Sequence, residues 1–286
     1  MFPLIAIVSV GIYIGKRHDP QLDSVNNVNL NVFVPALVFY SLTEQQFIFE
    51  QYALLALGGL ALVLITALIA LPIGRVMRVE YKTIAPPLMF HNAGNVGLPL
   101  LALALGPEGL AAGLILFLVG NITHFGLGSY MLDHDAKWLR SITSPAIIAA
   151  VCAFLLQAGN VEVAPYLMLP VQMLGNIAVP LMLFSLGVRL AHANVEHWHI
   201  GSVIGVLTPL IGMTLAFIII SLLPLDRTQA GALLLFGALP PAVMNFLFAE
   251  RYVQEPTKVS AIVLFGNVLA IFTLPLALLY VLPRFG

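Results

Sequence analysis

Ten long apolar blocks fill almost the whole sequence, and this feature leaves few folds open. They cover roughly residues 1–15, 26–43, 51–75, 83–105, 108–131, 143–159, 164–190, 199–224, 228–250 and 257–283. A helix that crosses a bilayer needs about 20 apolar residues. The chain is 60% hydrophobic and only 9% charged, whereas roughly 25% of the residues in a soluble domain are charged. We therefore expect an all-α integral membrane protein with ten transmembrane helices.

The basic residues alternate between the loops and orient these helices. The odd-numbered loops carry ten of the 12 Lys and Arg residues, and the even-numbered loops carry only Arg227. Loops rich in Lys and Arg lie on the cytoplasmic side of a membrane. This pattern predicts that both termini lie outside and that the loop at 132–142 is cytoplasmic.

Two motifs occur twice at almost the same spacing. Asn31–Phe39 and Asn176–Phe184 both read N-x-x-V-P-x-x-x-F, at an offset of 145. Leu118–Ile122 and Leu264–Val268 both read L-x-G-N-[IV], at an offset of 146. The agreement between the two offsets indicates an internal repeat of five helices.

Because five is an odd number, the second repeat enters the membrane from the opposite side. The sequence thus predicts a 5+5 inverted repeat, with residues 1–131 and 143–286 as the halves and 132–142 as a cytoplasmic linker. Secondary transporters have this architecture, and their binding sites form where helices break near the middle of the bilayer.

Two helices, the fourth and the ninth, are expected to be broken, and their breaks occupy equivalent windows at 92–99 and 238–245. Proline lacks a backbone donor and clashes with the preceding turn, and glycine weakens a helix. The residues that break the helices are Gly94, Gly97 and Pro99 in the first window and Pro240 and Pro241 in the second.

Each break creates a new helix N-terminus, with free N–H groups and a partial positive charge. Two such ends at mid-membrane can bind an anion without any Lys or Arg. The side-chain amides of Asn92, Asn95 and Asn245 can add hydrogen bonds to a carboxylate. A packing role is the alternative for each asparagine, because asparagines also form hydrogen bonds between membrane helices.

Other polar and kinked positions inside the blocks are secondary candidates. His91, Asn121 and Asn267 are candidates for a proton-exchanging or polar site, and His124 is the other histidine well inside a block. Helix packing is the alternative role for both histidines. The scaffold kinks are expected at Pro35 and Pro180, with Asn31 and Asn176 one turn earlier forming hydrogen bonds to neighbouring helices.

Several function classes are excluded by what the sequence lacks. It contains no zinc-protease, nucleophile-elbow or phosphate-loop motif, so we expect no enzyme, no metal and no cofactor. The net charge of −1 gives no reason to expect nucleic acid as a partner, and Cys152 alone cannot form an intrachain disulfide. No acidic residue falls in the middle of a block, which disfavours proton transfer through carboxylates.

The sequence resembles the auxin efflux carrier family, which joins the plant PIN-FORMED carriers with bacterial permeases of the malate and malonate type. The resemblance rests on the stretches Phe33–Phe39, Asn92–Leu101, Ala178–Pro180, Ser185–Leu190, Leu239–Pro240 and Phe248–Tyr252. It implies that helices 4 and 9 cross at their breaks. It also implies that a scaffold of helices 1, 2, 6 and 7 supports a moving unit of helices 3–5 and 8–10, in an elevator-type mechanism.

The resemblance also suggests roles for single residues. Asn92 is similar in position to the asparagine that meets the substrate carboxylate, and Val243 to a residue that lines the pocket. The long cytoplasmic loop of many plant members is missing, so the chain resembles a short bacterial member in the inner membrane, and a small metabolic acid is favoured over auxin.

We therefore expect a secondary transporter for a small organic anion, with a small carboxylate and the lipid bilayer as partners. Coupling to Na⁺ or H⁺ and assembly as a homodimer are left open. One alternative is a sodium-coupled organic-anion symporter of the bile-acid type, and another is a membrane sensor or channel that transports nothing.

Overall fold

The protein is built of apolar helices in a computed structural model that describes residues 2–18, 20–44, 49–133, 144–159, 161–191 and 196–285. Six helical segments in these ranges are long and apolar enough to cross a membrane: Ser24–Glu44, Gln51–Met77, Ala93–Leu132, Pro165–Val188, Trp198–Leu222 and Pro256–Phe285. Large apolar side chains point outward from them, among them Leu68, Leu222 and Leu276, each at least 66% exposed. Such a surface fits lipid and not water, so the protein is an integral membrane protein.

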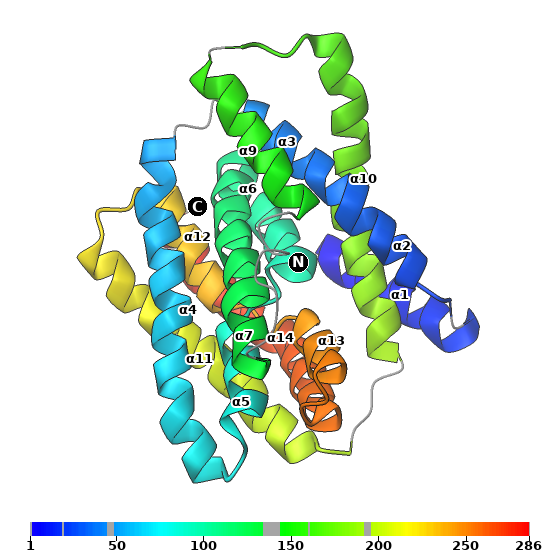
Figure 1. The fold of residues 1–286 in the computed structure, drawn as a ribbon, viewed down its shortest axis with the longest axis vertical. Coiled ribbons are helices and arrows are strands. Elements are labelled where there is room, and N and C mark those ends of the chain that lie inside the picture. The colour runs from blue at the N-terminus through cyan, green and yellow to red at the C-terminus, as the bar shows by residue number, and fades with distance from the viewer. Residues whose placement is uncertain are drawn as a thin grey trace.

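The helices form two groups that lie side by side (Figure 1). The first, which we call the scaffold group, consists of α1 (Phe2–His18), α2 (Asp23–Val28), α3 (Val34–Glu44), α9 (Pro145–Ala158) and α10 (Pro165–Ala191). Within it, α1 and α3 both pack on α10, and α9 packs on α3.

The second group, which we call the crossing group, holds the remaining helices. They are α4 (Phe49–Met77), α5 (Tyr81–Met89), α6 (Leu98–Thr123), α7 (Ser129–Leu132), α11 (Trp198–Leu222), α12 (Arg227–Gly237), α13 (Met244–Arg251) and α14 (Pro256–Phe285). Helix α11 packs on α14, α12 and α4, and α6 packs on both α4 and α12. Residues from the first and second halves of the chain therefore mix in both groups.

Each predicted apolar block contains helix, with ends that differ from the prediction by a few residues. Six of the described helical segments are long enough to span a membrane, whereas α9 has 14 residues and α5, α12 and α13 have 9, 11 and 8. The count of ten spans stays a prediction. Most of the predicted linker at 132–142 lies outside the described residues.

Both predicted interruptions are present. Helix α5, before the first break, ends at Met89. Helix α12, before the second break, ends at Gly237, and α13 begins after it at Met244. The first break is shorter than predicted, because a π-helical turn at Ala93–Gly97 leads directly into α6. Gly94 and Gly97 are therefore helical, and the non-helical backbone lies at 90–92.

Pro99 lies in the first turn of α6. Because the π-helical turn continues into α6, Pro99 removes one hydrogen bond from a continuous helix.

Gly106 reverses the chain inside the long segment 98–123. Its φ of 67° and ψ of −156° interrupt the helix, and only glycine adopts such angles readily. A side chain placed on Gly113 would meet Leu98 and Leu101 on the other side of this bend. The segments before and after Gly106 therefore pack against each other, as expected for the boundary between the fourth and fifth blocks.

The predicted scaffold kinks differ in form. A π-helical turn at Asn29–Phe33 comes just before Pro35, whereas Pro180 lies inside the helix α10. The expectation that Asn31 forms a hydrogen bond to a neighbouring helix is wrong, because its amide donates to the backbone oxygen and Oδ1 of Asn27 at 2.8 and 2.7 Å. Asn27 lies one turn earlier on the same helix face and is the nearer acceptor. Asn176 is exposed on α10.

Candidate functional site

The two broken segments cross each other and exchange backbone hydrogen bonds. His91 and Pro241 face each other as an antiparallel pair. The Asn92 N–H donates to the Pro240 oxygen, and the Ala242 N–H donates to the Phe90 oxygen, both at 2.8 Å. Unpaired backbone groups are costly inside a membrane. Each break therefore satisfies polar groups that the other break exposes.

Three asparagine side chains hold this crossing in place. Asn92 Nδ2 donates to Asn267 Oδ1 at 2.8 Å. Asn267 Nδ2 in turn donates to the oxygens of Pro241 and Val263 at 3.0 and 2.8 Å. Asn245 Nδ2 donates to the Phe90 oxygen at 3.1 Å. All three asparagines are buried, so their hydrogen bonds fix the two segments relative to each other and to α14.

The glycine of the L-x-G-N motif in α14, Gly266, allows close packing. A Cβ atom at this position would lie 2.5 Å from Pro241 Cδ, closer than side chains pack. The absence of a side chain lets the second broken segment lie directly on α14. Asn267, the next residue, then reaches the Pro241 oxygen.

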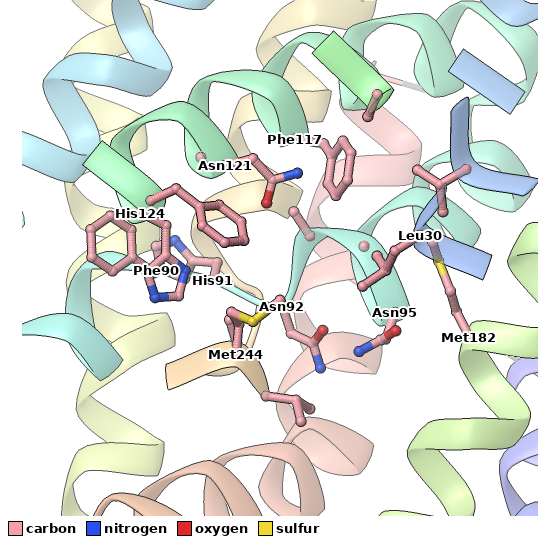
Figure 2. Close-up of a pocket in the computed structure, with 18 of the residues that line it drawn as sticks. Leu30, Phe90, His91, Asn92, Asn95, Phe117, Asn121, His124, Met182 and Met244 are labelled. Atoms are coloured by element: carbon pink, nitrogen blue, oxygen red, sulfur yellow. The ribbon is translucent and has the colours of Figure 1, made fainter. Parts of the chain in front are cut away.

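A cavity of about 320 Å³ lies beside the crossing, between the two helix groups (Figure 2). The crossing group contributes Phe90, His91, Asn92, Ala93, Gly94, Asn95, Phe117, Asn121, His124, Phe125, Val243, Met244 and Leu247 to its lining. The scaffold group contributes Asn26, Asn29, Leu30, Asn31, Val34, Ser185, Met182 and Leu186, with Ser144 and Pro145 at the start of α9. Among the described residues that line the cavity, none is Asp, Glu, Lys or Arg.

The structure brings some of the predicted site residues to the cavity and leaves others outside it. Asn92, Gly94, Asn95 and Val243 line the cavity. The other predicted binding residues, namely Gly97, Pro99, Pro240, Pro241 and Asn245, do not line it. The amide of Asn245 is instead bonded to the backbone of the crossing. None of these five residues is among those that line the cavity.

Some of the secondary candidates also line the cavity, and others do not. His91 and Asn121 line the cavity, and so does Asn31. Asn267 lies behind Asn92 and holds it. Pro35, Pro180 and Asn176 do not line the cavity.

Two buried histidines form one side of the cavity. His91 is 7% exposed, and neither ring nitrogen has a partner among the described residues. The ring of His124 stacks on Phe90 with centroids 4.1 Å apart and meets the edge-on ring of Phe248 at 4.6 Å. Its Nε2 is buried and also without a described partner. Figure 2 shows both histidines on the opposite side of Asn92 from Leu30 and Met182.

Two helix N-termini lie at the edge of the cavity. Gly94 and Asn95 belong to the turn that leads into α6, and Val243 and Met244 begin α13. The first N–H groups of a helix have no acceptor within that helix, and this end carries a partial positive charge. Both ends therefore place a partial positive charge beside the cavity, and none of the described residues that line it is Lys or Arg.

Sequence reasoning missed the scaffold wall of the cavity, which includes Asn29, Leu30, Met182 and Ser185. Ser185 does lie in a stretch that carries the family resemblance, so its polar character in an apolar helix was a usable signal. Leu30 and Met182 gave no signal, because apolar residues in a membrane helix usually face lipid or another helix.

The sequence matches the family described as Membrane transport protein over residues 134–278, just over half of the chain. The chain belongs to this membrane transport protein family. The match confirms the resemblance to the auxin efflux carriers that the sequence suggested. No curated protein matches the sequence at a level that shows a relationship.

The matched range contains the second half of the crossing, with Pro240, Asn245 and Asn267, and also contains Ser185 on the scaffold wall. As a membrane transport protein, the chain is a transporter and not an enzyme. The crossing and its cavity are thus the candidate site for a transported substrate.

Proposed function

We propose that this membrane transport protein is a secondary transporter for a small organic anion, a mono- or dicarboxylate, whose carboxylate binds at the crossing. The observation that carries the proposal is a cavity beside two helix N-termini and the amides of Asn92 and Asn95. Helix N-termini attract anions, because their N–H groups and dipoles both favour negative charge. No acidic residue among the described lining residues opposes this charge.

Asn92 would act as a positioned donor. Its Nδ2 carries two hydrogens, and the hydrogen bond to Asn267 uses one of them. The second remains for a carboxylate oxygen in the cavity. Because Asn267 fixes the side chain in advance, binding costs little ordering of Asn92, and the amide acts as a preorganised donor.

The proposal includes a 5+5 inverted repeat of ten helices. Its support is that the helices before the two breaks, α5 and α12, begin at Tyr81 and Arg227, at the same offset of 146 as the sequence motif. The crossing group would move past the scaffold group and carry the substrate across the membrane, as in an elevator. The position of the cavity between the two groups agrees with this. A location in a bacterial inner membrane, with both termini outside, belongs to the same proposal.

Coupling to an ion is part of the test. His91 and His124 are the only titratable side chains among the described residues that line the cavity, so a proton site would use them. Sodium would bind to amide and backbone oxygens near the breaks, as in the bile-acid type of symporter.

The test is substrate counterflow in proteoliposomes with radiolabelled monocarboxylates and dicarboxylates, with and without Na⁺ and a pH gradient. We expect uptake with the unmodified protein and a loss of at least tenfold with Asn92→Ala. Asn176→Ala, which changes an exposed asparagine away from the cavity, is the matched control. Full uptake by the Asn92 variant would remove this residue from the site. Single-channel currents in place of saturable counterflow would overturn the transporter mechanism.

A further inference from the structure

The scaffold wall of the cavity carries buried polar atoms that have no partner among the described residues. They are Asn26 Nδ2 on α2, Asn29 Oδ1 in the π-helical turn that follows, and Ser185 Oγ on α10. Asn29 is 3% exposed and Ser185 4% exposed. We call these three residues the scaffold triad.

Unpartnered polar atoms in a buried site are uncommon, because each forfeits hydrogen bonds that it had in water. A single one, such as Ser41 Oγ on α3, has no evident function. The scaffold triad differs because its three atoms come from two helices, the continuous run of α2 and the π-helical turn and the separate α10, and line one cavity. This convergence indicates a group that enters the cavity and bonds to them.

The chemistry of the triad selects a neutral group. Asn26 Nδ2 is a donor, Asn29 Oδ1 is an acceptor, and a serine hydroxyl is both. A hydroxyl can satisfy all of these roles. A second carboxylate fits them less well, since it offers no hydrogen to the Asn29 oxygen and finds no cation among the described lining residues.

Much of the cavity wall is apolar. Leu30, Val34, Met182 and Leu186 contribute from the scaffold group and Phe117 from the crossing group, alongside Asn31, Asn95 and Asn121. Figure 2 shows Leu30 and Met182 beside Asn95. A substrate that reaches both polar ends therefore needs a hydrocarbon body between its two polar groups.

We propose that the scaffold triad is a second binding subsite, which holds a hydroxyl of the substrate while the carboxylate lies at the crossing. The inference rests on the proposed function and narrows it to monocarboxylates that carry a hydroxyl at the far end of an apolar body. Ser185 and Asn29 then determine specificity. Because they belong to the scaffold group, the two subsites form one site only when the two helix groups are arranged as in this structure.

The test compares matched ligands that differ by one hydroxyl. Affinities of the purified protein are measured by calorimetry for 4-hydroxyphenylacetate against phenylacetate, and for 4-hydroxybutyrate against butyrate. With the unmodified protein we expect the hydroxylated member of a pair to bind about fivefold to tenfold more tightly, the effect of about one hydrogen bond. Succinate, with a second charge facing the triad, is expected to bind more weakly than 4-hydroxybutyrate.

Ser185→Ala is expected to bring the affinity ratio within each pair close to one, with the loss falling on the hydroxylated member. Ser41→Ala is the matched control, because Ser41 is equally buried in the scaffold group, also lacks a partner and does not line the cavity. It should leave the ratio unchanged. If Ser185→Ala does not fold, as judged by its melting profile, Asn29→Ala provides the same comparison.

Several results would overturn the subsite. They are an unchanged ratio in Ser185→Ala, an equal fall in Ser41→Ala, or tighter binding of succinate than of 4-hydroxybutyrate. The proposed function would still stand in each case, provided that the unmodified protein binds carboxylates and Asn92→Ala does not. If no carboxylate binds or is transported, the proposed function fails and the subsite fails with it.

Discussion

The side-chain amide of Asn92 donates a 2.8 Å hydrogen bond to Oδ1 of Asn267, although 175 positions separate the two residues. Asn267 also bonds the Pro241 oxygen of the other broken segment. One buried side chain thus joins both segments of the crossing to α14. The orientation of Asn92, which we propose binds the substrate, therefore depends on an intact crossing.

Replacing Asn267 by Ala should therefore impair binding as well as stability. The change leaves an Asn92 hydrogen and the Pro241 oxygen without their partner, and each unsatisfied buried group costs about 1–3 kcal/mol. We expect a lower melting temperature in detergent and at least a tenfold loss of carboxylate uptake. Asn176→Ala, at an exposed position, should change neither quantity. Normal uptake by a destabilised Asn267 variant would show that Asn92 needs no support.

The existence of the two breaks could be predicted from sequence, because proline and glycine act locally on a helix. Pro240 and Pro241 lie in the second break as predicted, whereas Gly94 and Pro99 marked the first break but lie just after it, in helical backbone. The way the breaks pair could not be predicted. The antiparallel contact of His91 with Pro241 depends on how distant helices pack, and no local pattern encodes it.

The two walls of the cavity differ in how far the sequence predicts them, and the reason is the same. Asn92 and Asn95 could be predicted as site residues because they lie in a window whose glycines and proline mark it as a helix break. Ser185 lies in a regular helix, and only the packing of α10 against α1 and α3 decides which of its faces meets the cavity. Asn245 shows the converse, since its type suggested a ligand but its amide is used by the Phe90 backbone.

Gly266→Ala should disturb the crossing without removing any hydrogen-bonding group. The added Cβ would lie 2.5 Å from Pro241 Cδ, so the second broken segment or α14 must shift. Overpacking of this kind costs about 1–3 kcal/mol. We expect a lower melting temperature and weaker substrate binding, both larger in Gly266→Val.

Gly126→Ala is the matched control, since nothing lies within 4 Å of a Cβ at that position. It should melt close to the unmodified protein. Equal melting temperatures for the Gly266 and Gly126 variants would mean that α14 does not support the crossing as closely as the structure indicates.

Gly106→Ala tests a backbone requirement in isolation. No atom lies within 4 Å of a Cβ at Gly106, so the variant introduces no clash. Its φ of 67° and ψ of −156° belong to a region that side chains disfavour, at a cost of about 1–3 kcal/mol. We expect a lower melting temperature, measured by thermal unfolding in detergent, with little change in substrate affinity. A variant as stable as the unmodified protein would show that the bend tolerates other angles.

Glu255, in the loop before α14, should make stability depend on pH. Partial burial raises the pKa of this carboxyl, but hydrogen bonds from Lys258 and Thr83 and the charges of Lys258 and His197 outweigh burial and hold the pKa below its usual range. The Thr83 hydrogen bond of 2.6 Å ties this loop to α5. Because the pKa is lower in the folded protein than in the unfolded chain, the ionised carboxylate favours folding.

This contribution is fully present above the pKa of the unfolded chain and is lost as the pH falls through the pKa of the folded protein. We therefore expect Glu255→Gln to melt below the unmodified protein at pH 7, with a difference that narrows as the pH is lowered toward 4. The measurement is a series of melting curves across this range. Glu250→Gln, an exposed neighbour, corrects for the change in net charge. A difference that stays constant from pH 7 to pH 4 would show that the carboxylate charge does not stabilise the contact between this loop and α5.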